Sequence, residues 1–253
     1  MNAKERVLFI SDCHLGGGPE GPAKARQERL ISFLEQEASR ADSLYMLGDI
    51  FDFWFEYRQA VPRRHFHVIA TLRKLSQAGV SLSFIGGNHD WWAGSFLRDE
   101  VGCQVHHKPV ETTIQQRRLL LAHGDGMTSG EHAYRAFRTV LRNPLTIGAY
   151  RLLHPDLGFG IADVVSKLSR ETNDESQFDA GRLCTDLAEP YFNRGIEAVL
   201  IGHFHHPTHL RRGDHEFLIL GDWLHNNTFA VLEDSKFSIR KWTGNDSELF
   251  VKS

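Results

Sequence analysis

Residues of metal-ligand type are grouped in five short segments of the chain. These read D-x-H at 12–14, G-D-x-x-D at 48–52, G-N-H-D at 87–90, H-G-D at 123–125 and G-H-x-H at 202–205. Carboxylate, imidazole and amide groups together suit divalent ions such as Mn²⁺, Fe²⁺, Mg²⁺ or Zn²⁺ better than a cysteine-based structural zinc site. Seven side chains qualify as ligands, too many for one ion but natural for two ions that share a carboxylate: Asp12, His14, Asp49, Asn88, His123, His203 and His205.

Two divalent ions side by side are typical of enzymes that hydrolyse phosphate esters. Metal ions about 3.5–4 Å apart generate hydroxide at neutral pH and hold both the attacking and the leaving oxygen of a phosphate ester. Four glycines in the motifs fit such a site, because a residue without a Cβ lets a ligand approach the backbone, but they fit ordinary turns as well: Gly48, Gly87, Gly124 and Gly202. One isolated D-x-H is typical of a turn, whereas the five segments together predict a phosphoester hydrolase.

Each segment follows an apolar run that is typical of a buried strand. The runs are VLFIS at 7–11, SLYML at 43–47, SLSFI at 81–85, LLLA at 119–122 and AVLI at 198–201. Side chains two residues apart on an extended segment point the same way, so Asp12 and His14 are expected to face one ligand while Cys13 faces the core. Helical periodicity between the runs, at 30–34, 68–75 and 183–191, predicts an α/β sheet with all five segments at one edge.

The composition is that of an ordinary soluble protein with a sizeable core. The 253 residues are 41% hydrophobic and 24% charged, and no apolar run approaches the roughly 20 residues that span a bilayer. The first residues lack a signal-peptide pattern, and three cysteines without a C-x-x-C pair fit a reducing compartment, so a cytoplasmic location is expected. A net charge of −3 gives no nucleic-acid signature. Six histidines outside the motifs are expected at the surface: His65, His67, His106, His107, His132 and His215.

Taken in order, the five motifs resemble the signature of the calcineurin-like metallophosphoesterases. The resemblance implies an α/β fold of four layers, α-β-β-α, with two sheets packed face to face between helices and the site at their edge. It implies that His89 is the catalytic histidine, which contacts the phosphoryl group and stabilises or protonates the leaving oxygen, and that Asp90 orients it. It also divides the ligands between two ions bridged by Asp49: Asp12, His14 and His205 for the first, and Asn88, His123 and His203 for the second.

Residues 131–179 differ in composition from the rest and are predicted to form a helical hairpin, inserted as a cap between the core segments 1–130 and 180–253. The first helix of the hairpin is expected to carry an apolar and a basic stripe on separate faces: Tyr134, Phe137 and Leu141 against Arg135, Arg138 and Arg142. Such a hairpin could cover an acyl chain and a pyrophosphate together. Alternatively, its apolar stripe packs on the core and its arginines face solvent.

With the cap included, nearly the whole chain resembles the UDP-2,3-diacylglucosamine pyrophosphohydrolases, a branch of the same superfamily that acts in bacterial lipid A biosynthesis. AYRAFR after H-G-D, SKLSRETN in the cap and FLILGDW near the end carry this resemblance. It implies metal-dependent hydrolysis of the pyrophosphate bond of UDP-2,3-diacylglucosamine to UMP and 2,3-diacylglucosamine 1-phosphate, with two divalent ions, usually Mn²⁺. Tyr134, Lys167 and Arg170 would be the cap residues that bind the substrate. Familiar members of that branch have arginine at the position of His89, whereas the wider superfamily has histidine.

The implied partner is an amphiphilic nucleotide-sugar lipid at the inner face of the cell membrane, which the hairpin would contact peripherally. No nucleic acid and no obligate protein partner are expected. Two alternatives remain open: a soluble phosphodiesterase or phosphatase for a nucleotide or other phosphoester, and a non-catalytic scaffold with the same fold. The presence of all seven ligand-type side chains together with His89 disfavours the scaffold. Asp52 and Asp125 each remain open between an acid that supports the site and a turn residue.

Overall fold

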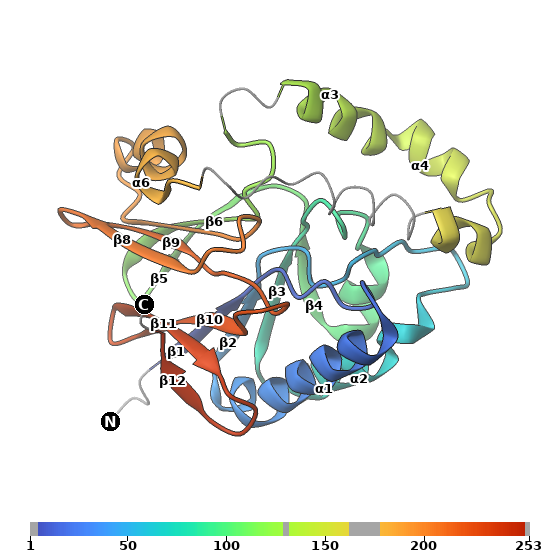
Figure 1. Ribbon diagram of the computed structural model, residues 1–253, viewed down its shortest axis with the longest axis horizontal. Helices are drawn as coiled ribbons and strands as arrows, with labels where there is room; N and C mark the ends of the chain where they lie inside the picture. The colour runs from blue at the N-terminus through green and yellow to red at the C-terminus, as the bar shows by residue number, and fades with distance from the viewer. Residues whose placement is uncertain (1–4, 129–131, 162–177, 251–253) are drawn as a thin grey trace.

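A seven-stranded sheet carries three of the five motifs. The computed structural model describes residues 5–128, 132–161 and 178–250. The strands of this sheet lie in the order β12-β11-β10-β1-β2-β3-β4 (Figure 1). Their bounds are β1 Arg6–Ile10, β2 Ser43–Met46, β3 Ser81–Ile85, β4 Cys103–His106, β10 Thr228–Glu233, β11 Lys236–Trp242 and β12 Ser247–Leu249. Because β1, β2 and β3 pair in parallel, the loops that follow them leave the same edge of the sheet.

A second sheet of five strands carries the other two motifs. Its order is β5-β6-β7-β9-β8, and β6, β7 and β9 pair in parallel. The bounds are β5 Val110–Ile114, β6 Arg117–Ala122, β7 Ala198–Ile201, β8 Thr208–Arg212 and β9 His215–Ile219. H-G-D follows β6 and G-H-x-H follows β7, so the five motif strands belong to two sheets.

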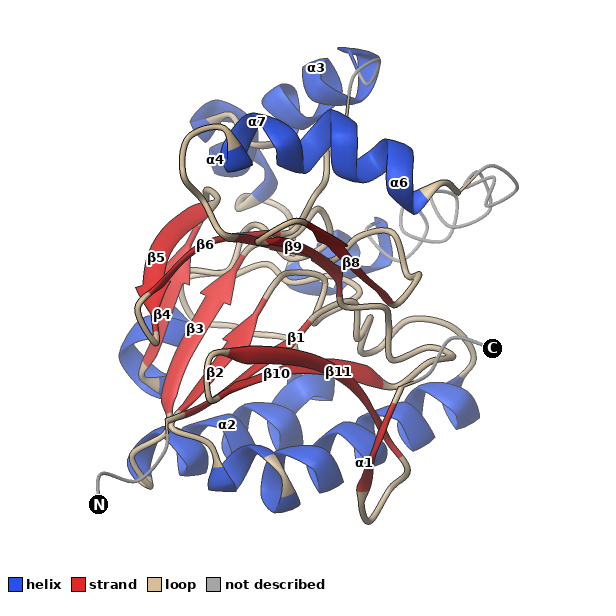
Figure 2. Cartoon of the chain, turned by 90° about the vertical axis from the view of Figure 1, so that its left-hand side faces the viewer, coloured by secondary structure: helices blue, strands red, loops and turns tan. Residues whose placement is uncertain are grey.

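The two sheets pack face to face, and helices cover both outer faces (Figure 2). Along β1, Val7 and Phe9 belong to the buried cluster between the sheets, whereas Leu8 and Ile10 pack with the helices outside. The seven-stranded sheet is covered by α1 Glu20–Gln36 and α2 Phe66–Gln77, and the other sheet by α6 Ala180–Leu183, η5 Cys184–Ala188 and α7 Glu189–Phe192. Three short helices complete the core: η1 Ala38–Arg40, η2 Arg63–His65 and η3 Leu97–Val101. The four-layer α/β prediction is confirmed.

Helices α3 His132–Leu141 and α4 Pro144–Tyr150, with a further helical stretch at 155–161, lie outside the two sheets (Figure 1). Asn143 caps α4 by accepting a 2.8 Å hydrogen bond from the Leu145 backbone N–H. Ile147 and Tyr150 pack against Phe53 and Phe55, so part of the apolar surface of these helices does rest on the core. Among the described residues, no helix is long and apolar enough to cross a bilayer. Two of the predicted substrate contacts lie outside the described residues: Lys167 and Arg170.

Candidate active site

The loops that follow β1, β2 and β7 hold their ligand-type residues in unusual backbone conformations. Five of these residues have φ between 42° and 69°: Asp12, His14, Asp49, His203 and His205. This left-handed region is uncommon for residues with a Cβ and concentrates at functional sites. The prediction that Asp12 and His14 point the same way from an extended strand is therefore wrong. β1 ends at Ile10, and the two side chains converge because the backbone turns at each of them.

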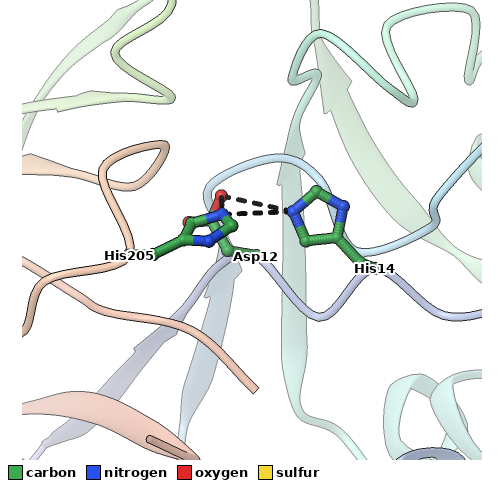
Figure 3. Close-up of side chains that lie close together, drawn as sticks. All are labelled: Asp12, His14 and His205. Carbon is green, nitrogen blue, oxygen red and sulfur yellow. Dashed lines mark hydrogen bonds and ion pairs between the residues drawn. The ribbon is translucent and has the colours of Figure 1, made fainter. Parts of the chain in front are cut away.

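One group of three side chains joins Asp12 and His14 to His205 from the other sheet (Figure 3). The Asp12 Oδ1 atom lies 3.3 Å from His205 Nε2 and 3.9 Å from His14 Nε2. The two Nε2 atoms are themselves 3.2 Å apart. A proton can join only one pair of these three atoms, whereas a divalent cation can bind all three, so the group fits a metal ion.

A second group forms around Asp49, with His123 and His203. The Asp49 Oδ2 atom lies 3.4 Å from His123 Nε2 and 3.8 Å from His14 Nε2, so one carboxylate oxygen faces imidazoles of both groups. Asn88 joins through its Oδ1 atom, 3.0 Å from His123 Nε2. The arrangement suits two ions that share the Asp49 carboxylate.

Backbone N–H groups hold one oxygen of each acid and leave the other to the imidazoles. Asp12 Oδ2 accepts a 2.9 Å hydrogen bond from the His203 N–H, and Asp49 Oδ1 accepts one of 2.9 Å from the His89 N–H. Two glycines make this possible. A Cβ at Gly202 would lie 2.5 Å from Asp12 Oδ2, and a Cβ at Gly87 would collide with Asp49 Oδ1. At these two positions, glycine is required by the close approach of an acid.

Burial and mutual attraction set the charge states of the two groups. Burial alone would raise the pKa of Asp49, but His123 and His89 outweigh it and hold that pKa well below its usual range. Burial alone would lower the pKa of His205, but its contact with the Asp12 carboxylate raises that pKa to about 9. Both acids are thus stabilised as anions by nearby positive charge, which divalent cations supply more strongly than protonated imidazoles.

Carbonyl groups orient two of the imidazole rings. His123 Nδ1 lies 2.8 Å from the Leu47 backbone oxygen, so Nδ1–H donates to it and Nε2 keeps a lone pair for a metal ion. In the same way His89 Nδ1 lies 2.8 Å from the Asp52 backbone oxygen, and its Nε2 lies 4.0 Å from Asp49 Oδ2. The Asp52 carboxylate is 2% exposed, with Oδ1 3.5 Å from His14 Nδ1, which favours an acid that supports the site over a solvated turn.

Asp90 is placed differently from the prediction that it orients His89. Its Oδ1 atom accepts hydrogen bonds from the backbone N–H groups of Asp49 and Gly87, at 3.0 and 2.9 Å. Its Oδ2 atom accepts from Ile50 and Phe51, at 2.7 and 3.2 Å. The buried Asp90 carboxylate instead fixes the loop after β2, and hence the position of Asp49. The G-N-H-D motif does not predict these contacts, because three of the four donor N–H groups belong to the loop after β2, about 40 residues earlier in the chain.

A cavity of about 450 Å³ opens beside His89, between the core and the helices α3 and α4. Asn88 and His89 form the part of its wall nearest the ligand-type groups. Most of the remaining wall is apolar: Phe53, Phe55, Trp92, Phe137, Leu141 and Ile147. Sequence reasoning did not identify the contribution of the 53–55 loop or of Trp92, because apolar side chains there are typical of ordinary core.

Asp125 joins the core to α3. Its Oδ2 atom accepts hydrogen bonds from Tyr134 Oη at 3.0 Å, Arg138 Nη1 at 3.0 Å and Arg142 Nη2 at 3.1 Å. The prediction of separate apolar and basic faces is wrong for these arginines, since Arg138 and Arg142 line the same cavity as Phe137. Positions spaced by three, four and eight residues from Tyr134 share one helical face. Tyr134 remains a proposed substrate contact.

His65 is a further correction, because it is fully buried rather than exposed. Its ring centroid lies 4.7 Å from that of Phe51, beneath the site loops. Burial, with the nearby Arg64 charge, lowers the pKa of His65 to about 3. The two arginines that precede His65 suggest a solvated position in the sequence, and only the tertiary packing of its ring shows otherwise.

The family model for calcineurin-like phosphoesterases matches residues 5–207. The chain belongs to this family. It is accordingly a phosphoester hydrolase that uses divalent metal ions, with His and Asp groups suited to hold them. As a member of the calcineurin-like phosphoesterase family, it has clear relatives. A UDP-2,3-diacylglucosamine hydrolase of Porphyromonas gingivalis is 30% identical over 247 residues, which cover 90% of this chain and 94% of the relative.

A UDP-2,3-diacylglucosamine hydrolase of Nitrosococcus oceani is 32% identical over 227 residues, covering 86% of this chain and 87% of the relative. Among solved structures, the E. coli phosphoesterase Yfce is similar at 16% identity with a TM-score of 0.45, covering 96% of each chain.

Proposed function

We propose that this calcineurin-like phosphoesterase hydrolyses the pyrophosphate bond of UDP-2,3-diacylglucosamine to UMP and 2,3-diacylglucosamine 1-phosphate, a step of lipid A biosynthesis. The observation that carries the proposal is the apolar cavity of about 450 Å³ whose wall includes Asn88 and His89. A phosphoester with an attached acyl chain would be held with its chain in this cavity and its phosphates at the metal ligands. The curated relatives that span nearly the whole chain carry the name of this activity.

The proposed cofactors are two Mn²⁺ ions. Oxygen and nitrogen ligands without thiolates suit Mn²⁺. Bound there, the ions would polarise the phosphoryl oxygens and lower the pKa of water. Their proposed ligands are Asp12, His14 and His205 for one ion, Asn88, His123 and His203 for the other, and Asp49 for both.

His89 is the proposed catalytic side chain of the protein itself. Since its Nδ1–H donates to the Asp52 carbonyl, its Nε2 atom points toward the ligand-type groups and the cavity. From there Nε2 would contact a phosphoryl oxygen, or hold a proton for the leaving oxygen. Asp90 is proposed to act through the backbone of the Asp49 loop and so is a positioning residue.

Residues 131–179 are proposed to act as a cap that covers the acyl chains and touches the inner face of the cell membrane. Three leucines in its described part are 83%, 88% and 56% exposed: Leu145, Leu152 and Leu157. Exposed leucines on short helices near arginines are typical of surfaces that enter the boundary layer of a bilayer. A cytoplasmic location at that face belongs to the same proposal, as do substrate contacts from Tyr134, Lys167 and Arg170.

The experiment that tests the proposal is release of UMP from UDP-2,3-diacylglucosamine by the Mn²⁺-loaded protein, with His205→Ala as the control. Turnover that disappears in the control is the expected result. No UMP release, alongside metal-dependent hydrolysis of bis(p-nitrophenyl) phosphate, would retain the phosphoesterase chemistry and overturn the substrate.

A further inference from the structure

Arg142 from the cap reaches the loop that carries Asn88 and His89. It follows the last residue of α3, and its backbone N–H continues the helical turn by donating to the Arg138 carbonyl at 2.9 Å. Its Nη2 atom donates to the backbone oxygen of Gly87 at 3.3 Å, directly before Asn88. A guanidinium from the inserted segment is therefore in contact with the core loop beside the metal ligands.

Contacts on two further sides fix the orientation of this guanidinium. Nη2 also donates to Asp125 Oδ2 at 3.1 Å, and the guanidinium carbon lies 5.0 Å from the centroid of the Trp91 ring. Asp125 and Trp91 come from separate loops of the core. Ordering a long side chain costs free energy, so a guanidinium held in this way is prepared for binding before a ligand arrives.

The local charge leaves an anion still to be bound. Arg138 and Arg142 both pair with the single carboxylate of Asp125, so the ion pairs among the described residues leave one positive charge in excess at the cavity wall. Both described hydrogen bonds from the Arg142 side chain leave from Nη2, so Nε and Nη1 remain as donors. The side chain is 19% exposed and lines the cavity together with Asn88 and His89. A partly buried positive charge beside the proposed metal ligands suits a phosphate group.

We propose that Arg142 binds the phosphate that stays on the acylated sugar, and that Asp125 positions it. This inference rests on the proposed function. Phe137 and Leu141 form the apolar wall on the same turns of α3, so a sugar whose acyl chain lies against them would bring its own phosphate to Arg142. The cap would then contribute to binding the diphosphate as well as the chain, and would distinguish acylated sugar diphosphates from phosphodiesters that lack a second phosphate.

The test compares Arg142→Gln with Arg142→Lys and with Arg151→Gln, an exposed arginine of the same segment that does not line the cavity. For each Mn²⁺-loaded protein, kcat/KM is measured on UDP-2,3-diacylglucosamine and on bis(p-nitrophenyl) phosphate. Removal of a charge-assisted hydrogen bond is expected to lower kcat/KM on the lipid roughly 10- to 100-fold in Arg142→Gln, and at least about tenfold more than on the aryl diester. Arg142→Lys keeps the positive charge but loses the planar guanidinium with its several donors. Its kcat/KM on the lipid should therefore lie between those of the wild type and Arg142→Gln.

Equal losses on both substrates in Arg142→Gln, or none, would overturn the inference, and so would the same loss in Arg151→Gln. Bound Mn²⁺ and the urea midpoint of each variant separate a binding defect from misfolding. If the wild type cleaves the aryl diester but not the lipid, the proposed function fails by itself. The readout is then inhibition of aryl diester hydrolysis by glucosamine 1-phosphate. An inhibition constant raised at least about tenfold in Arg142→Gln would still support phosphate binding, and an unchanged constant would refute it.

Discussion

Asp49 Oδ2 and His123 Nε2 lie 3.4 Å apart although they follow strands of different sheets, β2 and β6. A second hydrogen bond orients each side chain. The Asp49 Oδ1 atom accepts from the His89 backbone N–H, and His123 Nδ1–H donates to the Leu47 carbonyl. The packing of one sheet on the other thereby sets the separation of the two groups of ligands. A change in that packing would therefore alter the distance between the ligands of the two proposed metal ions.

Replacement of Asp52 by asparagine is expected to weaken metal binding without unfolding the protein. The carboxylate lies 3.5 Å from His14 Nδ1, and loss of such a partner typically costs about 10- to 100-fold in metal affinity. The variant keeps the backbone carbonyl that faces His89. Competition with a chelator measures the Mn²⁺ affinity, and the exposed Asp156→Asn serves as the control. An unchanged Mn²⁺ affinity would show that the Asp52 carboxylate does not support metal binding.

His89→Gln is expected to lower kcat on UDP-2,3-diacylglucosamine by about 10²- to 10⁴-fold, because the residue contributes proton transfer or a contact to the phosphoryl group. Bound Mn²⁺ should stay at the wild-type level, since His89 is not one of the proposed ligands. Steady-state kinetics and metal analysis on the same preparation check both statements, with the exposed His67→Gln as a control. Loss of metal together with kcat would instead make His89 a ligand.

Phe137→Ser is expected to raise KM for UDP-2,3-diacylglucosamine by about tenfold or more, because the ring forms part of the apolar cavity wall. Phe66→Ser is a matched control, since Phe66 is also a solvent-exposed phenylalanine on a helix but lies outside that wall. A Michaelis constant equally affected in both variants, or in neither, would argue against acyl binding in the cavity.

His65 is expected to make the stability of the protein fall in acid. Its folded pKa of about 3 lies below the ordinary value near 6.5, so the unfolded chain binds the proton first and folding is penalised as the pH falls through that window. Between about pH 7.5 and pH 5.5 the free energy of unfolding should fall about 1.4 kcal/mol more in the wild type than in His65→Phe. Urea unfolding at both pH values measures this difference. An equal decrease in the free energy of unfolding in the two proteins would show that His65 is not the cause of the pH dependence.

The ligand-type residues of the site could be read from the sequence because each motif is short and follows its own apolar strand. Helices α1 and α2 were found by periodicity, and Leu30, Phe33, Val68 and Leu72 are indeed buried on them. The left-handed backbone at Asp12 and His14 could not be foreseen, since no residue type requires it there.

Other features depend on contacts between segments far apart in the chain. The burial of His65, the loop-fixing hydrogen bonds of Asp90 and the reach of Arg142 to Gly87 all involve partners that periodicity does not identify. The strands that no motif follows, β4, β5 and β8 to β12, were also not predicted, and the patterns of the half-exposed β8 and the three-residue β12 are weak. Local chemistry was therefore easier to predict than the tertiary contacts that support it.

The most direct test of the Asp49-bridged centre is the number of Mn²⁺ ions bound per chain, measured after desalting for the wild type and Asp49→Asn, together with turnover of UDP-2,3-diacylglucosamine. Two ions in the wild type, fewer than one in the variant and loss of turnover are the expected results. Two ions and undiminished turnover in a folded Asp49→Asn protein would contradict the bridged centre.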